Sequence, residues 1–331
     1  MIHRLFLYAD QNADDYMNRY IRNLISEQFN ISDLDFTEDS ETDSNIFDKN
    51  VLEPQALYDK ILYGDIINAD DVDYLDKFTA VVKPADIDDL KEIINFYSMY
   101  HYKHSLNWID VSGFTDMNGV FVDAVYDGDI SKWDVSHVTN MKHMFAASGF
   151  NGDISEWDVS NVTNMHHMFY HSEFNNNISG WDVSNVKNMS SMFMHSKFNT
   201  DISRWDVSNV YTMNSMFHSS QFNKDISGWD VSHVNDMNYM FMDSVFDQNI
   251  SKWNMINVNS MAGMFAYSSF KQDISEWDVS NVHNMIRMFA GSHFCNDISN
   301  WDVGNVDNFQ GIFDDSKMPE EYKPAKFRDI K

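Results

Sequence analysis

The stretch WDVSNVTNMHHMFYHSEFNNNISG, residues 157–180, decides the fold because it recurs with little change along most of the chain. Its tryptophan returns at an unbroken step of 24 residues, at 133, 157, 181, 205, 229, 253, 277 and 301. One further unit begins at Ile109, which precedes the same Asp-Val-Ser, so Trp108 lies one residue out of register. A fixed period of this length is typical of stacked repeat proteins. We call each 24-residue unit a coil, number the coils 1 to 9 from Ile109, and count positions from the tryptophan.

Apolar residues fill the same positions of nearly every coil: Trp at 1, Val at 3 and 6, Met at 9 and 12, Phe at 13 and 18, and Ile at 22. Positions 6, 9 and 13 have helical spacing, and the Ser at 4 is a suitable N-cap. Positions 22, 1 and 3 follow the spacing of a leucine-rich-repeat strand. The pattern predicts an α/β repeat solenoid, right-handed and leucine-rich-repeat-like, with one short strand and one short helix per coil over residues 109–318, and a core of Met and Phe.

The stretch FNGDISEWDVSNVTNMHHMF, residues 150–169, and its copies resemble the BspA-like family of leucine-rich-repeat proteins, known from bacterial surface proteins, mycoplasmas and tailed phages. The resemblance covers about two thirds of the chain and reaches upstream through residues 88–121, which are similar to the family's lead-in helix and first coil. It implies a curved solenoid used for binding, with no catalytic residues. The absence of a visible leader or anchor favours a phage or intracellular member over a surface-displayed one.

Outside the repeats, the sequence predicts two further parts. Residues 1–85 are expected to form a small, mainly helical N-terminal region, with an acidic linker at 31–50 and an amphipathic helix at 11–29. Pro84 and Asp86 are a helix-start signal and predict a helix within 86–108. We expect this helix to cap the stack, because the open end of a stack of coils must be covered. Residues 319–331 are expected to be a polar C-terminal tail or cap.

The charge balance limits the possible partners. The 51 acidic residues against 23 basic ones give a net charge of −28, which disfavours direct contact with nucleic acid or anionic membrane. Cys295 is the one cysteine, so no disulfide can form within the chain. The N-terminal apolar run is too short for a signal peptide, and no window is long enough for a membrane span. The expected location is the cytoplasm or a virion rather than secretion by the usual route.

Aspartates form two columns, at positions 2 and 21. One interpretation is structural: each carboxylate accepts the N–H two residues on, as in an Asx turn. The alternative is a ladder of calcium sites along Asp134, Asp158, Asp182, Asp206 and Asp230. Asn177, Asn249 and Asn254 interrupt the columns, which favours the structural interpretation.

Three other columns give weaker signals. The serine at position 16 recurs in eight of the nine coils without a fixed histidine, so we expect a buried turn serine rather than a nucleophile. His171 and His195 share position 15 in neighbouring coils and are either exposed histidines or a weak metal contact. The Asn or Asp at position 19 is expected to adopt unusual backbone angles in a turn, as at Asn151, Asn175, Asn199, Asn223 and Asp247.

Specificity is expected where residues vary on a constant frame. Position 24 changes at each step, which is typical both of a recognition stripe and of an unselected surface; it holds Lys132, Glu156, Gly180, Arg204, Gly228, Lys252, Glu276 and Asn300. The sequence therefore predicts a non-enzymatic protein–protein interaction module, with no cofactor and an unknown protein partner. A phage virion or host-interaction role follows from the resemblance. Two alternatives stay open: an acidic DNA mimic that occupies nucleic-acid-binding proteins, and a structural spacer or decoration protein.

Overall fold

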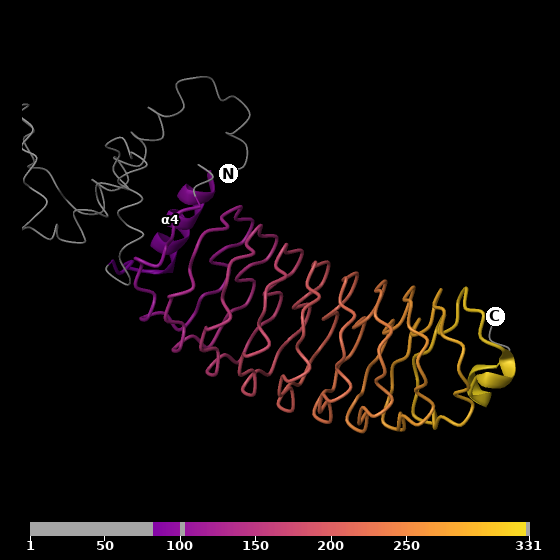
Figure 1. Ribbon diagram of the computed structural model, residues 1–331. Coiled ribbons are helices and arrows are strands. Elements are labelled where there is room, and N and C mark those ends of the chain that lie inside the picture. The colour runs from indigo at the N-terminus through magenta and orange to yellow at the C-terminus, as the bar shows by residue number, and fades with distance from the viewer. Residues whose placement is uncertain (1–81, 100–102, 329–331) are drawn as a thin grey trace, which may run out of the picture.

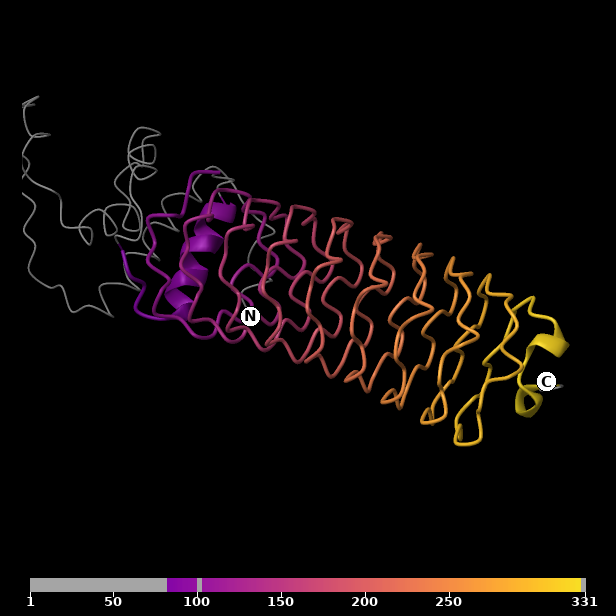
Figure 2. The ribbon, with the colours of Figure 1, turned by 60° about the horizontal axis from the view of Figure 1, so that its bottom comes forward.

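The protein is a stack of nine coils that follow one another along one axis. The computed structural model describes residues 82–99 and 103–328, and the coils lie side by side in chain order in two views (Figures 1 and 2). Helix α4 (Ile87–Met99) lies at one end of the stack, and two 3-10 turns, η3 (Glu320–Tyr322) and η4 (Ala325–Phe327), lie at the other. The elements expected in residues 1–81 lie outside the described residues. Within the described ranges, no helix has the length and apolar character needed to cross a bilayer.

The core consists of aromatic columns that run the length of the stack. Phenylalanines at position 13 of successive coils stack with ring centroids 4.9–6.0 Å apart. A second column at position 18 stacks at 6.2–6.4 Å. Between coils 2 and 8, the methionines at positions 9 and 12 are fully buried beside them. The predicted core is confirmed, and each ring pair adds about 0.5–1.5 kcal/mol beyond its buried area.

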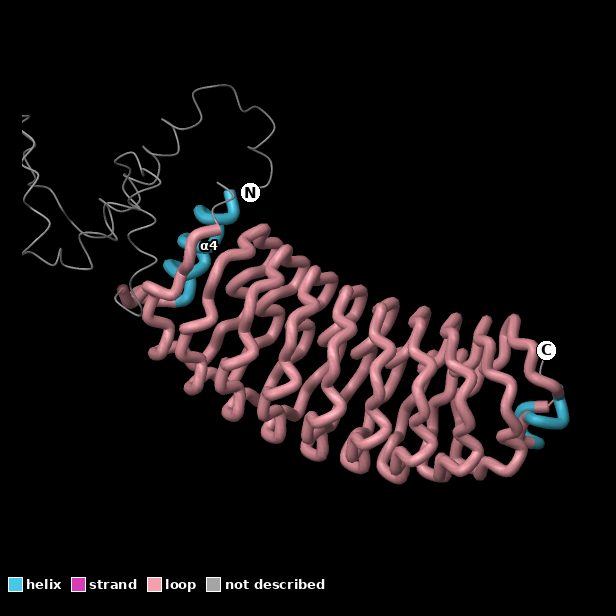
Figure 3. The backbone as a smooth tube through the Cα atoms, in the orientation of Figure 1, coloured by secondary structure: helices cyan, strands magenta, loops and turns pink. Residues whose placement is uncertain are grey.

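The short helix predicted in each coil is wrong. Residues 109–318, all of them described, contain no helix; positions 9–16 form a run of turns instead (Figure 3). Amide groups at odd positions donate to the next coil, as from Met141 to Asn164 O at 2.9 Å, whereas Met144 N donates back within its own coil to Met141 O at 3.2 Å. The backbone is left-handed at positions 11 and 15 of every coil, with φ between 52° and 68°. A right-handed helix cannot contain such residues, because its φ is negative throughout.

The strand predicted across positions 22, 1 and 3 is also wrong, because its amides are used locally. The aspartate at 21 accepts the N–H at 23, and the aspartate at 2 accepts the N–H at 4, as from Ser160 to Asp158 at 3.0 Å. Trp157 N donates to Ile154 O at 3.2 Å, which closes a turn between them. Parallel pairing between coils occurs as single bridges at position 8, from Asp116↔Asn140 to Asn284↔Asn308.

Side chains join one coil to the next in three rows. The indole Nε1 of each repeat tryptophan donates to the main-chain carbonyl 27 residues earlier, which belongs to Leu106 or to an isoleucine at position 22, at 2.8–3.2 Å. Asparagines at position 5 donate to the carbonyl at position 4 of the preceding coil at 2.6–2.8 Å. At position 19, each side-chain oxygen accepts the N–H of the same position one coil on, at 2.7–3.0 Å.

The asparagines and aspartate at position 19 do not have the unusual backbone angles predicted for them. Asn151, Asn175, Asn199, Asn223 and Asp247 are not among the left-handed residues. Their amide and carboxylate side chains are needed as acceptors between coils, since neighbouring coils leave these N–H groups without a carbonyl partner.

The helix predicted from Pro84 and Asp86 is confirmed as α4. Asp86 Oδ1 accepts the N–H groups of Asp88 at 2.9 Å and Asp89 at 3.1 Å, so it acts as the N-cap. Leu90, Ile94 and Tyr97 of α4 are buried in the same core as the coils. Val82 pairs with Ile109, which extends the stack by one bridge ahead of coil 1.

The C-terminal segment covers the last coil with an apolar side chain as well as polar ones. Phe327 is 2% exposed and lies 5.1 Å from Phe309, measured between ring centroids. The ammonium of Lys326 donates to the carbonyls of Val303, Gly304 and Val306 at 3.1, 3.1 and 2.7 Å. Where the next coil has asparagine at position 5, its side chain donates a hydrogen bond to the carbonyl at position 4. At Gly304, which is position 4 of the last coil, the ammonium of Lys326 donates this hydrogen bond instead.

Candidate functional site

One side of the stack differs in chemistry from the rest of this acidic protein. The side chains at positions 10, 11, 14 and 15 lie outside the main hydrophobic cluster, and most of them are exposed or half-buried; we call this side of coils 2–8 the turn face. Of its 28 residues, Asp243 alone is acidic. The turn face also holds six of the 13 histidines and three tyrosines: His143, His166, His167, His171, His195, His218, Tyr170, Tyr239 and Tyr267.

Two tyrosines of the turn face lie directly against glycines of the following coil. A Cβ atom at Gly263 would come within 2.6 Å of Tyr239 Cδ1, and one at Gly291 within 2.5 Å of Tyr267 Cδ1. Both glycines are left-handed, at φ +59° and +60°. Tyr239 is 40% exposed and Tyr267 52% exposed, so each ring is supported underneath and open to solvent above.

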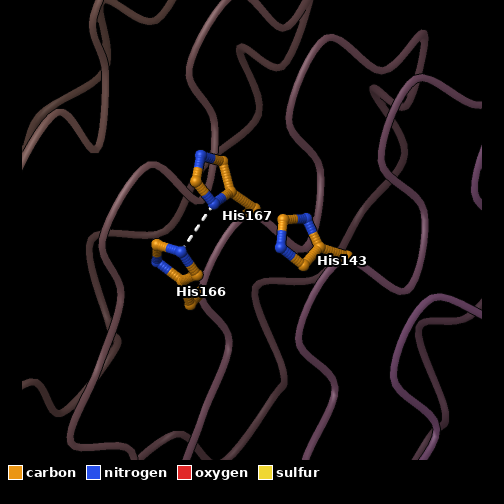
Figure 4. Close-up of side chains that lie close together, drawn as sticks. All are labelled: His143, His166 and His167. Carbon is orange, nitrogen blue, oxygen red and sulfur yellow. Dashed lines mark hydrogen bonds between the residues drawn. The ribbon is translucent and has the colours of Figure 1, made fainter.

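Three histidines meet at the second and third coils (Figure 4). His143 comes from coil 2, and His166 and His167 come from coil 3; one ring nitrogen from each lies within 4.8 Å of the other two. His167 Nδ1 is 2.7 Å from His166 Nε2, so these two nitrogens share a hydrogen bond. The rings of His143 and His167 are nearly parallel, with centroids 4.8 Å apart.

Burial keeps these rings neutral. Desolvation lowers the pKa of His143 and His166, and lowers the pKa of His167 to about 4. The positive charge of Lys142 acts in the same direction on all three. Neutral imidazole is the form that binds metal ions, so the lowered pKa values favour the protonation state that a ligand set requires, although the charge of Lys142 itself opposes a cation.

The aspartate columns form the Asx turns expected of them. Ser160 N donates to Asp158 Oδ1 at 3.0 Å, and Ser155 N donates to Asp153 Oδ1 at 2.9 Å. Hydrogen bonds from these serines lower the pKa of both carboxyl groups. The calcium ladder along Asp134, Asp158, Asp182, Asp206 and Asp230 stays a prediction, since the bonds to serine leave the second oxygen of each carboxylate available.

The other predicted residues are placed as follows. The position 24 side chains, including Lys132, Glu156, Arg204, Lys252, Glu276 and Asn300, are all exposed, and a recognition role for them stays a prediction. The position 16 serines between coils 2 and 8 are buried, and each Oγ accepts the N–H two residues on, as Ser148 does from Phe150 at 3.1 Å. This confirms the turn serine. The rings of His171 and His195 are exposed, with centroids 6.2 Å apart.

The sequence interpretation missed the histidine cluster and the turn face. It assigned positions 10–15 to a helix, on which His143 and His167 would have appeared as scattered surface residues. A signal was present: positions 11 and 15 of all nine coils hold no β-branched residue, and four of the eighteen are glycine. That restriction is typical of a left-handed backbone.

The comparisons with known proteins agree with a repeat architecture. The family model described as "Mycoplasma protein of unknown function, DUF285" matches the chain three times in tandem, at residues 88–197, 171–269 and 242–323. Together these matches cover 236 of the 331 residues. Among the curated proteins and the solved structures, nothing matches the chain.

Proposed function

The chain belongs to the Mycoplasma family of unknown function DUF285, whose tandem repeats fit a binding module, and we propose that it binds a protein partner through the turn face. The observation that carries this proposal is the near absence of carboxylates from that face. Protein interfaces are depleted in Asp, Glu and Lys at their centre and enriched in Tyr, Met and Arg. The turn face has this composition, on a chain with a net charge of −28.

The supported tyrosines are the proposed anchors. An aromatic side chain that is held in place before binding loses little conformational freedom on binding. Tyr239 and Tyr267 meet this condition because Gly263 and Gly291 let the rings lie against the backbone. Met194 and Met242, which are half-buried at position 14, add adaptable apolar surface to the same face.

We also propose that the stack is a solenoid of the leucine-rich-repeat type in which turns take the place of strand and helix. The support is the repeat length and the spacing of the buried columns, which follow that pattern even though the hydrogen bonds do not. In such arrays each coil contacts its neighbours only, so outward residues can change without disturbing the frame. The phage or intracellular setting rests on the sequence resemblance and forms part of the proposal.

The test is partner capture with the full chain and matched variants. Tyr239→Ser and Tyr267→Ser introduce a residue that this chain already carries at those positions, as Ser215 and Ser219. The control is Lys252→Gly with Glu276→Gly on the position 24 stripe, where Gly180 and Gly228 occur naturally. We expect the tyrosine variants to weaken capture at least tenfold and the stripe variants to leave it unchanged.

Each other outcome favours a different candidate. Loss of the partner with the stripe variants alone would move recognition to position 24. Recovery of nucleic-acid-binding enzymes that dissociate at high salt would favour the acidic decoy, because contacts between exposed charges are screened by salt. A partner retained by all four substitutions would refute both faces and place its binding elsewhere on the chain, whereas capture of no partner by the parent chain would favour the spacer role.

A further inference from the structure

The histidine cluster has the chemistry and geometry of a metal site. We propose that His143, His166 and His167 bind one divalent transition metal ion, with zinc as the first candidate. Imidazole nitrogen is a preferred ligand of zinc, copper and nickel, and three histidines with an open position form a recurrent zinc site. This inference goes beyond the proposed function and does not depend on it.

The distances suit a tetrahedral ion after small side-chain rotations. Zinc binds imidazole nitrogen at about 2.0–2.1 Å, so two ligand atoms on a tetrahedral ion lie roughly 3.3 Å apart. One nitrogen from each ring lies within 4.8 Å of the other two, and His167 Nδ1 lies 2.7 Å from His166 Nε2. The separation required by zinc thus lies within the range of nitrogen–nitrogen distances in the cluster.

The backbone fixes where the three rings start. His143 N donates to His166 O at 2.9 Å, and His167 N donates to Ser190 O at 3.0 Å, so both position 11 residues are tied to the next coil. His166 N donates to Asn164 Oδ1 at 3.1 Å. The left-handed angles of His143 (φ 55°) and His167 (φ 57°) place the two rings in a stack, and His166 joins them from the adjacent position. Ligands on such a fixed frame lose little freedom when a metal binds.

One atom of the cluster is not accounted for by contacts within the protein. Nδ1 of His166 is buried and has no hydrogen-bond partner. A buried polar atom without a partner is unfavourable by about 1–3 kcal/mol, and rotation of the His166 ring when a metal binds would change the surroundings of this atom as well as those of Nε2, which faces His167.

The charges around the cluster predict one substitution that strengthens metal binding, in contrast to the loss expected when a histidine is replaced. Lys142 is the positively charged side chain that acts on all three rings, and it opposes a bound cation. Its position 10 equivalents in coils 5 and 6 are Asn214 and Asn238, so asparagine is compatible with the fold there. Replacing this lysine should therefore strengthen binding at a true site, and should leave unchanged any metal bound elsewhere on the acidic surface.

Three protein ligands leave at least one coordination position open. A water molecule can occupy it, and so can a carboxylate, imidazole or thiolate supplied by a binding partner. Because the cluster lies within the turn face, a metal here would add a strong, chemically selective contact at one end of that face.

The experiment is a zinc titration of the full chain after treatment with a chelator, followed by calorimetry at pH 7.5, with Co²⁺ absorption as a second readout of tetrahedral nitrogen ligation. All samples carry Cys295→Ser, because the exposed thiol is itself a zinc ligand. We expect one tight equivalent of metal. His167→Ser and His166→Asn, which copy Ser191 and Asn214 from other coils, should each weaken it more than about 100-fold, beyond the effect of losing an outer-shell partner.

Two controls keep the result decisive. His195→Ser changes an exposed histidine of the turn face outside the cluster and should leave the tight equivalent intact, whereas Lys142→Asn should strengthen it. Thermal melting of each metal-free variant shows that it is folded. The proposal is overturned if the full chain binds no stoichiometric zinc, or if folded His167→Ser and His166→Asn chains bind it as tightly as the parent does.

Discussion

Gly263→Ala distinguishes the run of turns from a helix by the sign of its effect on stability. If positions 9–16 formed a helix, alanine in place of an interior glycine would stabilise the chain by about 0.5–1 kcal/mol. In the structure Gly263 has φ +59°, so the substitution should destabilise the chain instead. An L-residue in the left-handed region is less stable than in a right-handed helix by roughly 1–2 kcal/mol.

A steric term adds to this backbone term. The new Cβ would meet Tyr239 Cδ1 at 2.6 Å and Cε1 at 2.7 Å, so the ring must move off the glycine. The tyrosine is 40% exposed and can rotate, which limits the penalty to part of its packing against the backbone. We expect a total loss of about 1–3 kcal/mol in the free energy of unfolding, from the backbone and steric terms together.

The assay is denaturant unfolding of the full chain, followed by circular dichroism and tryptophan fluorescence. Gly228→Ala is the matched control, because nothing lies within 4 Å of its added Cβ and its φ is not left-handed. The double variant Tyr239→Ser with Gly263→Ala removes the steric term and should recover part of the loss. A Gly263→Ala chain as stable as the parent, or more stable, would refute the left-handed turn.

Three further predictions concern the columns, the histidines and the cap. Asp182→Ala should lose about 0.5–2 kcal/mol of unfolding free energy, because Ser184 N then lacks its acceptor at 3.0 Å, whereas Asp182→Asn, which copies Asn254, should be neutral in the same denaturant assay. Burial lowers the pKa of His218, so the neutral ring stabilises the fold above pH 6.5 and this contribution is lost as the pH falls below it. His218→Met, which copies Met194, should therefore reduce the drop in melting temperature between pH 7 and 5, and an unchanged drop would contradict the burial argument. Phe327→Ala should lose about 3 kcal/mol and expose the last coils to hydrogen exchange first, because a repeat array unfolds from an uncovered end.

The sequence predicts the features of this fold that depend on one coil alone. The 24-residue step, the burial of Trp157, Met165 and Phe169, and the Asx turn at Asp158 each follow from residue type and spacing within one unit. The capping helix α4 is also predictable, since Asp86 and the apolar residues after it carry a local signal. Each of these features depends on residues close together in the sequence, so an assignment made for one coil holds for the other coils as well.

The path of the backbone could not be predicted, because its hydrogen-bond partners lie in other coils. Positions 9 and 13 have the spacing of a helix, yet Met141 N and Phe145 N donate to Asn164 O and Met168 O one coil away. A helical spacing of buried residues is compatible with any backbone that returns the same positions to the core. The histidine cluster depends on the same missing information, because His143 and His167 stack only once the backbone is known to be left-handed at both.

The left-handed backbone also bears on whether the composition of the turn face is a consequence of the fold. At positions 11 and 15 the fold admits Gly, Asn, Asp and His most readily, and it excludes β-branched residues. Aspartate is thus well suited to these positions, and coils 1 and 9 indeed place Asp123 and Asp315 there. Between these two coils Asp243 is the single aspartate at fourteen left-handed positions, although the chain uses aspartate freely elsewhere on its surface. The backbone therefore accounts for the lack of Val, Ile and Thr, but not for the lack of carboxylates. The lack of negative charge on this face thus has a cause other than folding, and the partner contact that we propose is the cause that the composition supports best.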